Sequence, residues 1–212
     1  VMGTFLVRSG ILNSVHTFAN DPTRGIYILV FLSLMILASV YILFSKYKPA
    51  SIEINSNSKE TFVLVNNWFM IFYLITVLLG TLYPIFTDAI SNNKISVGPP
   101  FYNSVIIPVV VIFLFFMAIG PNAKWIKNKF IDIKIYSLIT LAAIFFNFII
   151  FFFFKSYSII SNLIVISSLF LILSSIMDLF KKISFNFPRV VSHLSFGFLI
   201  LFIGLNHNFS VE

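Results

Sequence analysis

The sequence predicts an all-α fold, a polytopic transmembrane helix bundle with about six membrane helices. Apolar residues make up 59% of the chain and charged residues only 10%, and the mean hydropathy is +1.01. Soluble domains, by contrast, are about 25% charged. Because a backbone in lipid must satisfy its own hydrogen bonds, and because the apolar runs lack the alternation of barrel strands, each run is expected to be a helix.

Six apolar runs approach the roughly 20 residues that are needed to cross about 30 Å of hydrocarbon. Polar residues, glycine or proline separate each run from the next. We therefore expect spans near residues 26–44, 62–83, 104–120, 135–154, 159–179 and 190–205.

Positive charge is distributed unevenly between the two sides that alternating spans create. Basic loops stay on the cytoplasmic side of a membrane, so the richer side is predicted to be cytoplasmic, or the matrix side in an organelle. The N-terminal stretch, the loop at residues 84–103 and the C-terminal end then lie on the periplasmic or outer side. Of the 14 lysines and arginines, the poorer side holds only Arg8, Arg24, Lys94 and Lys155, and the richer side holds Lys46, Lys48, Lys59, Lys124, Lys127, Lys129, Lys134, Lys181, Lys182 and Arg189.

Few polar residues interrupt the predicted spans. Asn147 lies within the fourth span and is expected to hydrogen-bond between helices. Asp178 lies at the cytoplasmic end of the fifth span, just before Lys181 and Lys182, and is interpreted as an interfacial acid beside lysines. The Gly98-Pro99-Pro100 stretch predicts a rigid surface turn.

The chain is predicted to divide into three parts. Residues 1–25 form a periplasmic segment that contains His16, residues 26–205 form the transmembrane bundle, and residues 206–212 begin a truncated periplasmic region. The chain starts with Val1 and stops directly after an apolar run, so we expect it to be a fragment of a larger protein.

His16 lies in the periplasmic segment, among small and apolar neighbours. A neutral imidazole at a membrane surface can be a simple interfacial side chain. The alternative is an axial ligand to haem iron, for which imidazole nitrogen is a common donor. In that case the flanking Arg8 and Arg24 are candidates to pair with the haem propionates, because arginine pairs well with carboxylates.

His193 lies inside the sixth predicted span. An ionisable residue within a membrane helix is a functional candidate by default, and a haem-iron ligand is the functional interpretation. The alternative is a histidine that only hydrogen-bonds to a neighbouring helix. His207, beyond the span, is expected to be interfacial.

Several kinds of chemistry find no support in this sequence. The absence of cysteine excludes thiolate nucleophiles and cysteine metal sites in this chain. The sequence has no basic stripe interleaved with exposed aromatic residues, which a nucleic-acid-binding surface would need. A transporter or channel subunit would call for paired intramembrane charges or inverted repeats, and none is clear. That class and a structural membrane scaffold remain the alternative functions.

Three stretches, in a fixed order, carry a resemblance to a known family. GTFLVRSGILNSVHTFANDPTRG resembles the family signature that follows a tryptophan-rich domain. NNWFMIFYLITVLLGTLYPIF, followed by KISVGPPFYN, resembles its next paired helix and loop. HLSFGFLILFIG, leading into NHNFSVE, resembles its late histidine helix, with Ser195 where the family usually has glycine. The family is CcmF/NrfE, the haem lyase component of cytochrome c maturation.

This resemblance implies a large inner-membrane protein with a periplasmic tryptophan-rich WWD segment that holds incoming haem. Two periplasmic histidines would ligate that substrate haem, and two membrane histidines would ligate a resident haem b. His16 matches the second periplasmic histidine, and His193 matches the second membrane histidine. The remaining two histidines and the WWD segment are expected upstream of this fragment.

The activity implied for the intact protein is that of a haem lyase subunit. It would attach haem covalently to the CxxCH motif of apocytochrome c at the outer face of the membrane. The implied partners are apocytochrome c, a haem-delivery chaperone, other cytochrome c maturation membrane subunits and the lipid bilayer. The expected location is a bacterial inner membrane, or a mitochondrial inner membrane.

Overall fold

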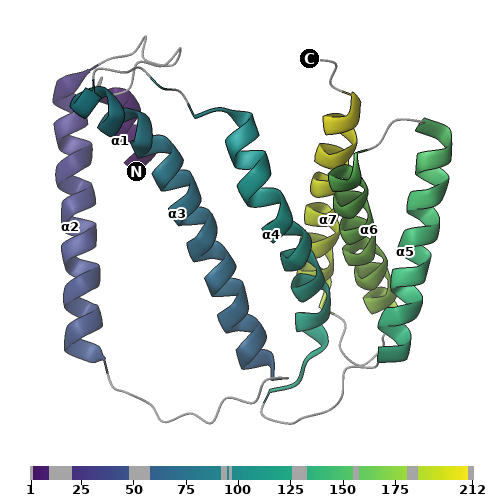
Figure 1. Ribbon diagram of the computed structural model, residues 1–212. Helices are drawn as coiled ribbons and strands as arrows, with labels where there is room; N and C mark the ends of the chain where they lie inside the picture. The colour runs from purple at the N-terminus through teal and green to yellow at the C-terminus, as the bar shows by residue number, and fades with distance from the viewer. Residues whose placement is uncertain are drawn as a thin grey trace. The chain divides into compact units, whose positions relative to one another are not determined.

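The fold is known from a computed structural model that describes residues 2–9, 21–47, 58–91, 95, 97–125, 133–154, 158–180 and 186–209. Within these ranges the chain is helical and contains no strand, which confirms the predicted all-α class (Figure 1). The helices are α1 (Met2–Arg8), α2 (Pro22–Lys46), α3 (Lys59–Ser91), α4 (Pro99–Ile119), the 3-10 helix η2 (Gly120–Asn122), α5 (Ile133–Phe154), α6 (Ile159–Leu179) and α7 (Phe187–Phe209).

Six helices of the described residues, α2 to α7, are long and apolar enough to cross a membrane. This number agrees with the six predicted spans. Their limits differ from the prediction at two proline-containing stretches.

The first difference is at Pro84, where a loop was predicted to begin. The helix instead continues through Pro84 to Ser91. The Thr87 hydroxyl donates to the carbonyls of Tyr83 and Pro84, at 3.2 and 3.0 Å. Side-chain hydrogen bonds of this kind help a membrane helix to accommodate proline. The loop prediction was therefore wrong for residues 84–91.

The second difference is at Gly98-Pro99-Pro100, which begins α4 instead of forming a surface turn. Gly98 is the N-cap, and the two prolines occupy the first helical positions. Proline is favoured there because its missing N–H would have no helical partner in any case. The prediction of a turn was wrong for this reason.

The described chain divides into two compact units, Val1–Glu53 with Thr81–Ser96 and Ile54–Gly80 with Val97–Glu212. In the first unit α1 packs on α2. Asp21 caps α2 by accepting a hydrogen bond from the Arg24 backbone N–H at 3.2 Å, and its carboxylate pairs with the Arg24 guanidinium at 3.1 Å.

In the second unit α6 is the central helix and packs against α4, α5 and α7. Its apolar core joins α6 to α4 and α5 through Leu114, Ala118, Ile139, Ala143, Phe170 and Leu171. A second cluster, Val165, Ile172 and Leu201, joins α6 to α7.

Small residues let α6 and α7 approach closely. A Cβ added at Gly197 would lie 2.7 Å from Ile172 Cγ1, and one added at Gly204 would lie 2.8 Å from Ile164 Cγ2. On α6, the buried Ser167, Ser168 and Ser175 hydroxyls donate to carbonyls of their own helix. This is the packing expected of membrane helices, where small side chains bring backbones together.

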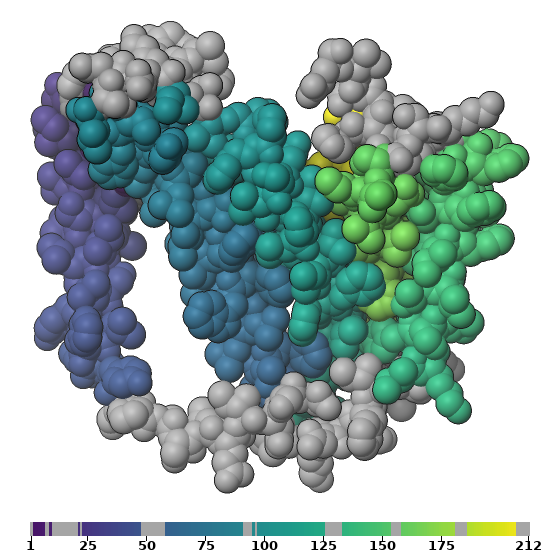
Figure 2. Space-filling model, in the orientation of Figure 1, coloured from purple at the N-terminus to yellow at the C-terminus, as the bar shows by residue number. Residues whose placement is uncertain are grey.

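Large apolar side chains cover the outer face of α5, the green helix in Figure 2. They are exposed in the isolated chain, and a row of this composition fits contact with lipid tails. The row consists of Leu138, Leu141, Phe145, Phe148 and Phe152.

Candidate cofactor site around His193

His193 lies near the start of α7, in the second unit. Asn186 caps this helix by accepting a hydrogen bond from the Arg189 backbone N–H at 3.3 Å. Pro188 follows in the first turn, where its missing N–H costs little. His193 comes one turn after Arg189 and its side chain is half-buried.

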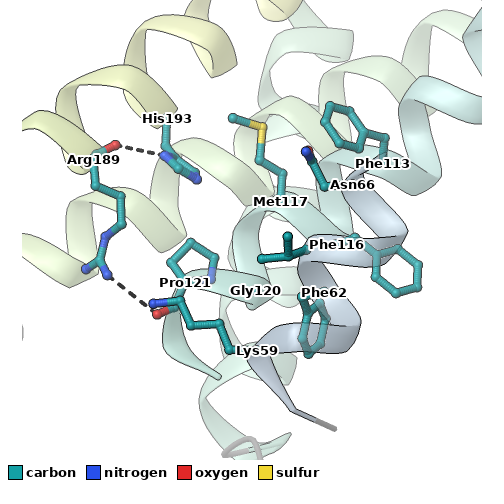
Figure 3. Close-up of a pocket in the computed structure, with 11 residues that line it drawn as sticks. Lys59, Phe62, Asn66, Phe113, Phe116, Met117, Gly120, Pro121, Arg189 and His193 are labelled. Carbon is teal, nitrogen blue, oxygen red and sulfur yellow. Dashed lines mark hydrogen bonds between the residues drawn. The ribbon is translucent and has the colours of Figure 1, made fainter. Parts of the chain in front are cut away.

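The orientation of the imidazole is set by a backbone carbonyl. His193 Nδ1 lies 2.8 Å from the Arg189 carbonyl oxygen (Figure 3). A carbonyl can only accept, so Nδ1 carries the hydrogen and donates it. In the neutral ring, Nε2 then holds the free lone pair. Histidines that ligate metals typically hold their second ring N–H in this way, which fixes both tautomer and ring plane.

His193 lines a cavity of about 300 Å³ between α3, α4, η2 and α7. Aromatic and other apolar side chains form most of its wall, and the charged lining residues are Lys59 and Arg189 (Figure 3). Cofactor sites commonly have this composition, an apolar wall with a few placed polar groups. The wall contains Phe62, Val63, Asn66, Phe113, Phe116, Met117, Gly120 and Pro121.

A partly buried polar cluster, with Asp178 as its buried member, lies where α6 ends and α7 begins. It consists of Asn122, Tyr136, Asp178 and Arg189, and we call it the Asp178 cluster. The Asn122 amide donates to both Asp178 carboxylate oxygens, at 3.2 and 3.4 Å, and to the Tyr136 hydroxyl at 3.0 Å. The Arg189 guanidinium lies 3.8 Å from the same carboxylate and donates to the Pro121 carbonyl at 3.5 Å.

The sequence predicted Asp178 to be an interfacial acid beside lysines, and the structure corrects this in one respect: the side chain is enclosed by the fold at the C-terminal end of α6. Its side chain is only 7% exposed and is paired with Arg189. Its carboxylate also sits at the C-terminal end of α6, where the helix dipole disfavours negative charge. The hydrogen bonds and the arginine charge compensate for burial at this position.

The other predicted site residues are not among the described residues that line this cavity. His16 and the side chains of Arg8 and His207 lie outside the described residues. Arg24 lies in the first unit, paired with Asp21. The proposed roles of His16, Arg8 and Arg24 toward substrate haem therefore stay predictions.

The prediction for Asn147 is confirmed. Its amide donates to Asn162 Oδ1 at 3.1 Å, which joins α5 to α6. This is the inter-helix hydrogen bond expected of an asparagine in a span.

In the parts of the chain that the structure describes, no group of three or more His, Asp or Glu side chains is placed to hold a metal ion. A protein site for a bare ion such as zinc supplies three or four ligands. One imidazole supplies a single axial position of haem iron, whose other ligands come from the porphyrin and one further side chain. His193 could supply one such nitrogen to haem iron.

Sequence reasoning did not connect Lys59, Asn122 and Arg189 with His193. Only Asp178 carried a usable signal, because an acid inside a membrane helix calls for a partner. Its neighbours Lys181 and Lys182 were the obvious candidates in sequence. The partners seen in the fold are Asn122, which is 56 positions away in the sequence, and Arg189, which lies on the next helix.

The helices and this site define a multi-pass membrane protein with a histidine at the wall of a mainly apolar cavity. Comparison with known proteins confirms the resemblance seen in the motifs. The chain is 42% identical over 127 residues to the cytochrome c-type biogenesis protein CcmF of Pseudomonas fluorescens. The matched region covers 59% of this chain and 19% of that protein.

Two further relatives agree. CcmF of Escherichia coli is 37% identical over 131 residues, 61% of this chain and 20% of that protein. The cytochrome c-type biogenesis protein NrfE of Haemophilus influenzae is 36% identical over 134 residues, 61% of this chain and 21% of that protein. The chain thus spans about a fifth of the length of these relatives. No family model and no solved structure matches it.

Proposed function

We propose that this chain is the part of a cytochrome c biogenesis protein that supplies one membrane histidine, His193, to a resident haem b. The observation that carries the proposal is the Nδ1 hydrogen bond to the Arg189 carbonyl, which leaves Nε2 available for iron. The homologues, named as cytochrome c-type biogenesis proteins, support the general role.

The residues around His193 fit the chemistry of haem. Phe62, Phe113 and Phe116 supply an apolar wall for a porphyrin face. Lys59 and Arg189 supply positive charge at the cavity, as the propionates would require. Haem b in this site would supply an electron that keeps substrate iron reduced. Burial and the hydrogen bond on His193 would tune its potential.

In the intact protein we propose the role of a haem lyase subunit, which attaches haem to the CxxCH motif of apocytochrome c at the outer face of the membrane. His16 would ligate the substrate haem, with Arg8 and Arg24 near its propionates. The cysteine nucleophiles belong to the apocytochrome, and this chain has no cysteine of its own. A haem-delivery chaperone and other maturation subunits would be partners, in a bacterial or mitochondrial inner membrane with the basic loops inside.

The test uses the full-length protein purified in detergent. A reduced-minus-oxidised absorption spectrum is recorded for the unchanged protein and for His193→Ala. We expect loss of the bis-histidine b-type signal in the variant. An unchanged signal, at equal protein yield, would refute His193 as the ligand. His16→Ala should keep this signal and lower the yield of c-type cytochrome, and an unchanged yield would refute its role.

A transporter or channel subunit and a structural scaffold are the competing functions. A transport path would need charged groups along the membrane interior. Within the described ranges, the buried ion pair Asp178–Arg189 lies at the ends of α6 and α7 and not along their length. This arrangement favours an anchored helix end over a path for ions.

A further inference from the structure

Asp178 joins elements that are far apart in the sequence. Its carboxylate accepts from Asn122, which follows α4, and pairs with Arg189 in the first turn of α7. Asn122 in turn donates to Tyr136 on α5. One buried carboxylate therefore ties the first turn of α7 to three neighbouring elements.

The first turn of a helix is its weakest part, because its N–H groups lack helical partners and it opens readily. In α7 this turn has two anchors. Asn186 caps it from the exposed side, and the Asp178 cluster holds the Arg189 side chain from the buried side. Arg189 also accepts the hydrogen bond from His193 Nδ1. Arg189 thus makes both contacts: its carbonyl orients the imidazole of His193, and its guanidinium pairs with Asp178.

We infer that Asp178 is a positioning residue for His193, which acts through Arg189 to fix the first turn of α7 and the plane of the imidazole. The part of this inference that concerns haem rests on the proposed function. The part that concerns the α7 turn does not. A purely structural ion pair would contribute to stability without a specific effect on His193.

The experiment compares three variants of the full-length protein. Asp178→Asn removes the charge with little change in volume. Tyr136→Phe removes only the hydroxyl that accepts from Asn122, and it is the milder change if Asp178→Asn fails to accumulate. Ser175→Ala is the matched control. Ser175 is buried on the same helix, and its hydroxyl donates to Leu171 of that helix, without a bond to the described residues of α7.

The first readout needs no haem. Amide hydrogen exchange is measured by mass spectrometry on the peptide that contains the start of α7, in the unchanged protein and in each variant. Asp178→Asn removes the charge that pairs with Arg189 and accepts from Asn122, and loss of an interaction with a charged group corresponds to about a tenfold change in a local opening equilibrium. We expect about tenfold faster exchange there in Asp178→Asn, a smaller increase in Tyr136→Phe and no change in Ser175→Ala. Unchanged exchange in both cluster variants would overturn the inference.

The second readout is the haem itself. We expect Asp178→Asn to keep the b-type absorption signal while shifting the midpoint potential and the low-spin electron paramagnetic resonance g values, which report the imidazole plane. Ser175→Ala should shift neither. Equal shifts in Ser175→Ala, or none in Asp178→Asn, would overturn the positioning role. If His193→Ala keeps the haem signal, the proposed function fails, and the exchange experiment still decides the role of Asp178 in anchoring α7.

Discussion

The contact between Gly197 and Ile172 yields a prediction about how tightly α7 is held against α6. In Gly197→Ala the new methyl group would lie 2.7 Å from Ile172 Cγ1, whereas carbon atoms in contact are ordinarily about 3.5–4.0 Å apart. The two groups must therefore separate by about 1 Å. Ile172 is 5% exposed and β-branched, so it has little freedom to rotate within its helix.

Overpacking of this kind costs about 1–3 kcal/mol, and the higher helix propensity of alanine offsets up to about 1 kcal/mol of it, so we expect Gly197→Ala to lower the free energy of unfolding by up to about 2 kcal/mol. Reversible unfolding in mixed detergent would measure it. Ser195→Ala, on the exposed side of the same helix, is the control and should change stability by less than about 0.5 kcal/mol.

The mechanism itself is tested by a double-mutant cycle with Ile172→Ala. This change alone should cost about 2–5 kcal/mol because it leaves a cavity. It also removes the atom that the methyl group added by Gly197→Ala would meet, so the double variant should be more stable than the sum of the single effects by about 1 kcal/mol or more. Strict additivity would refute the explanation by steric contact.

Two smaller predictions follow from polar contacts. Asn147→Leu should change the free energy of unfolding by less than about 1 kcal/mol, because it loses one bond to Asn162 and also removes a buried Oδ1 that has no hydrogen-bond partner among the described residues. A loss above about 2 kcal/mol in the same unfolding assay would contradict this. Arg24→Ala should also alter stability by less than about 1 kcal/mol, because the Arg24 side chain in its ion pair with Asp21 is 72% exposed. A fall in c-type cytochrome yield at unchanged thermal stability would then indicate a contact with haem, and a large stability loss would refute this use of the variant.

The class of fold and the number of membrane helices could be predicted from the sequence because both depend on local hydropathy. The limits of α3 and α4 could not be predicted in this way, because a proline can end a helix, begin one or lie inside one. At Pro84 the helix tolerates it with help from Thr87, and at Pro99 it begins a helix. The outcome depends on hydrogen bonds and neighbours that a hydropathy profile does not contain.

The candidate site was predictable only in part. His193 stands out in the sequence as an ionisable residue in an apolar run, and the structure adds its tautomer and cavity. The Asp178 cluster was not predictable, since Asn122 and Asp178 are 56 positions apart and Pro121 and Arg189 are 68 apart. Such contacts are consequences of how α4, α6 and α7 pack.

The composition of the Asp178 cluster bears on its purpose. Replacing a buried ion pair with well-packed apolar side chains is often neutral or stabilising, whereas removing one partner is strongly destabilising. A membrane bundle that required only stability could close this end with leucine and phenylalanine, as the core around Phe170 does. Apolar packing, however, would not hold the Arg189 side chain in one place. Arg189 also presents its carbonyl to His193. A charged and directional contact with Asp178 therefore explains how Arg189 is held in position, which burial alone does not.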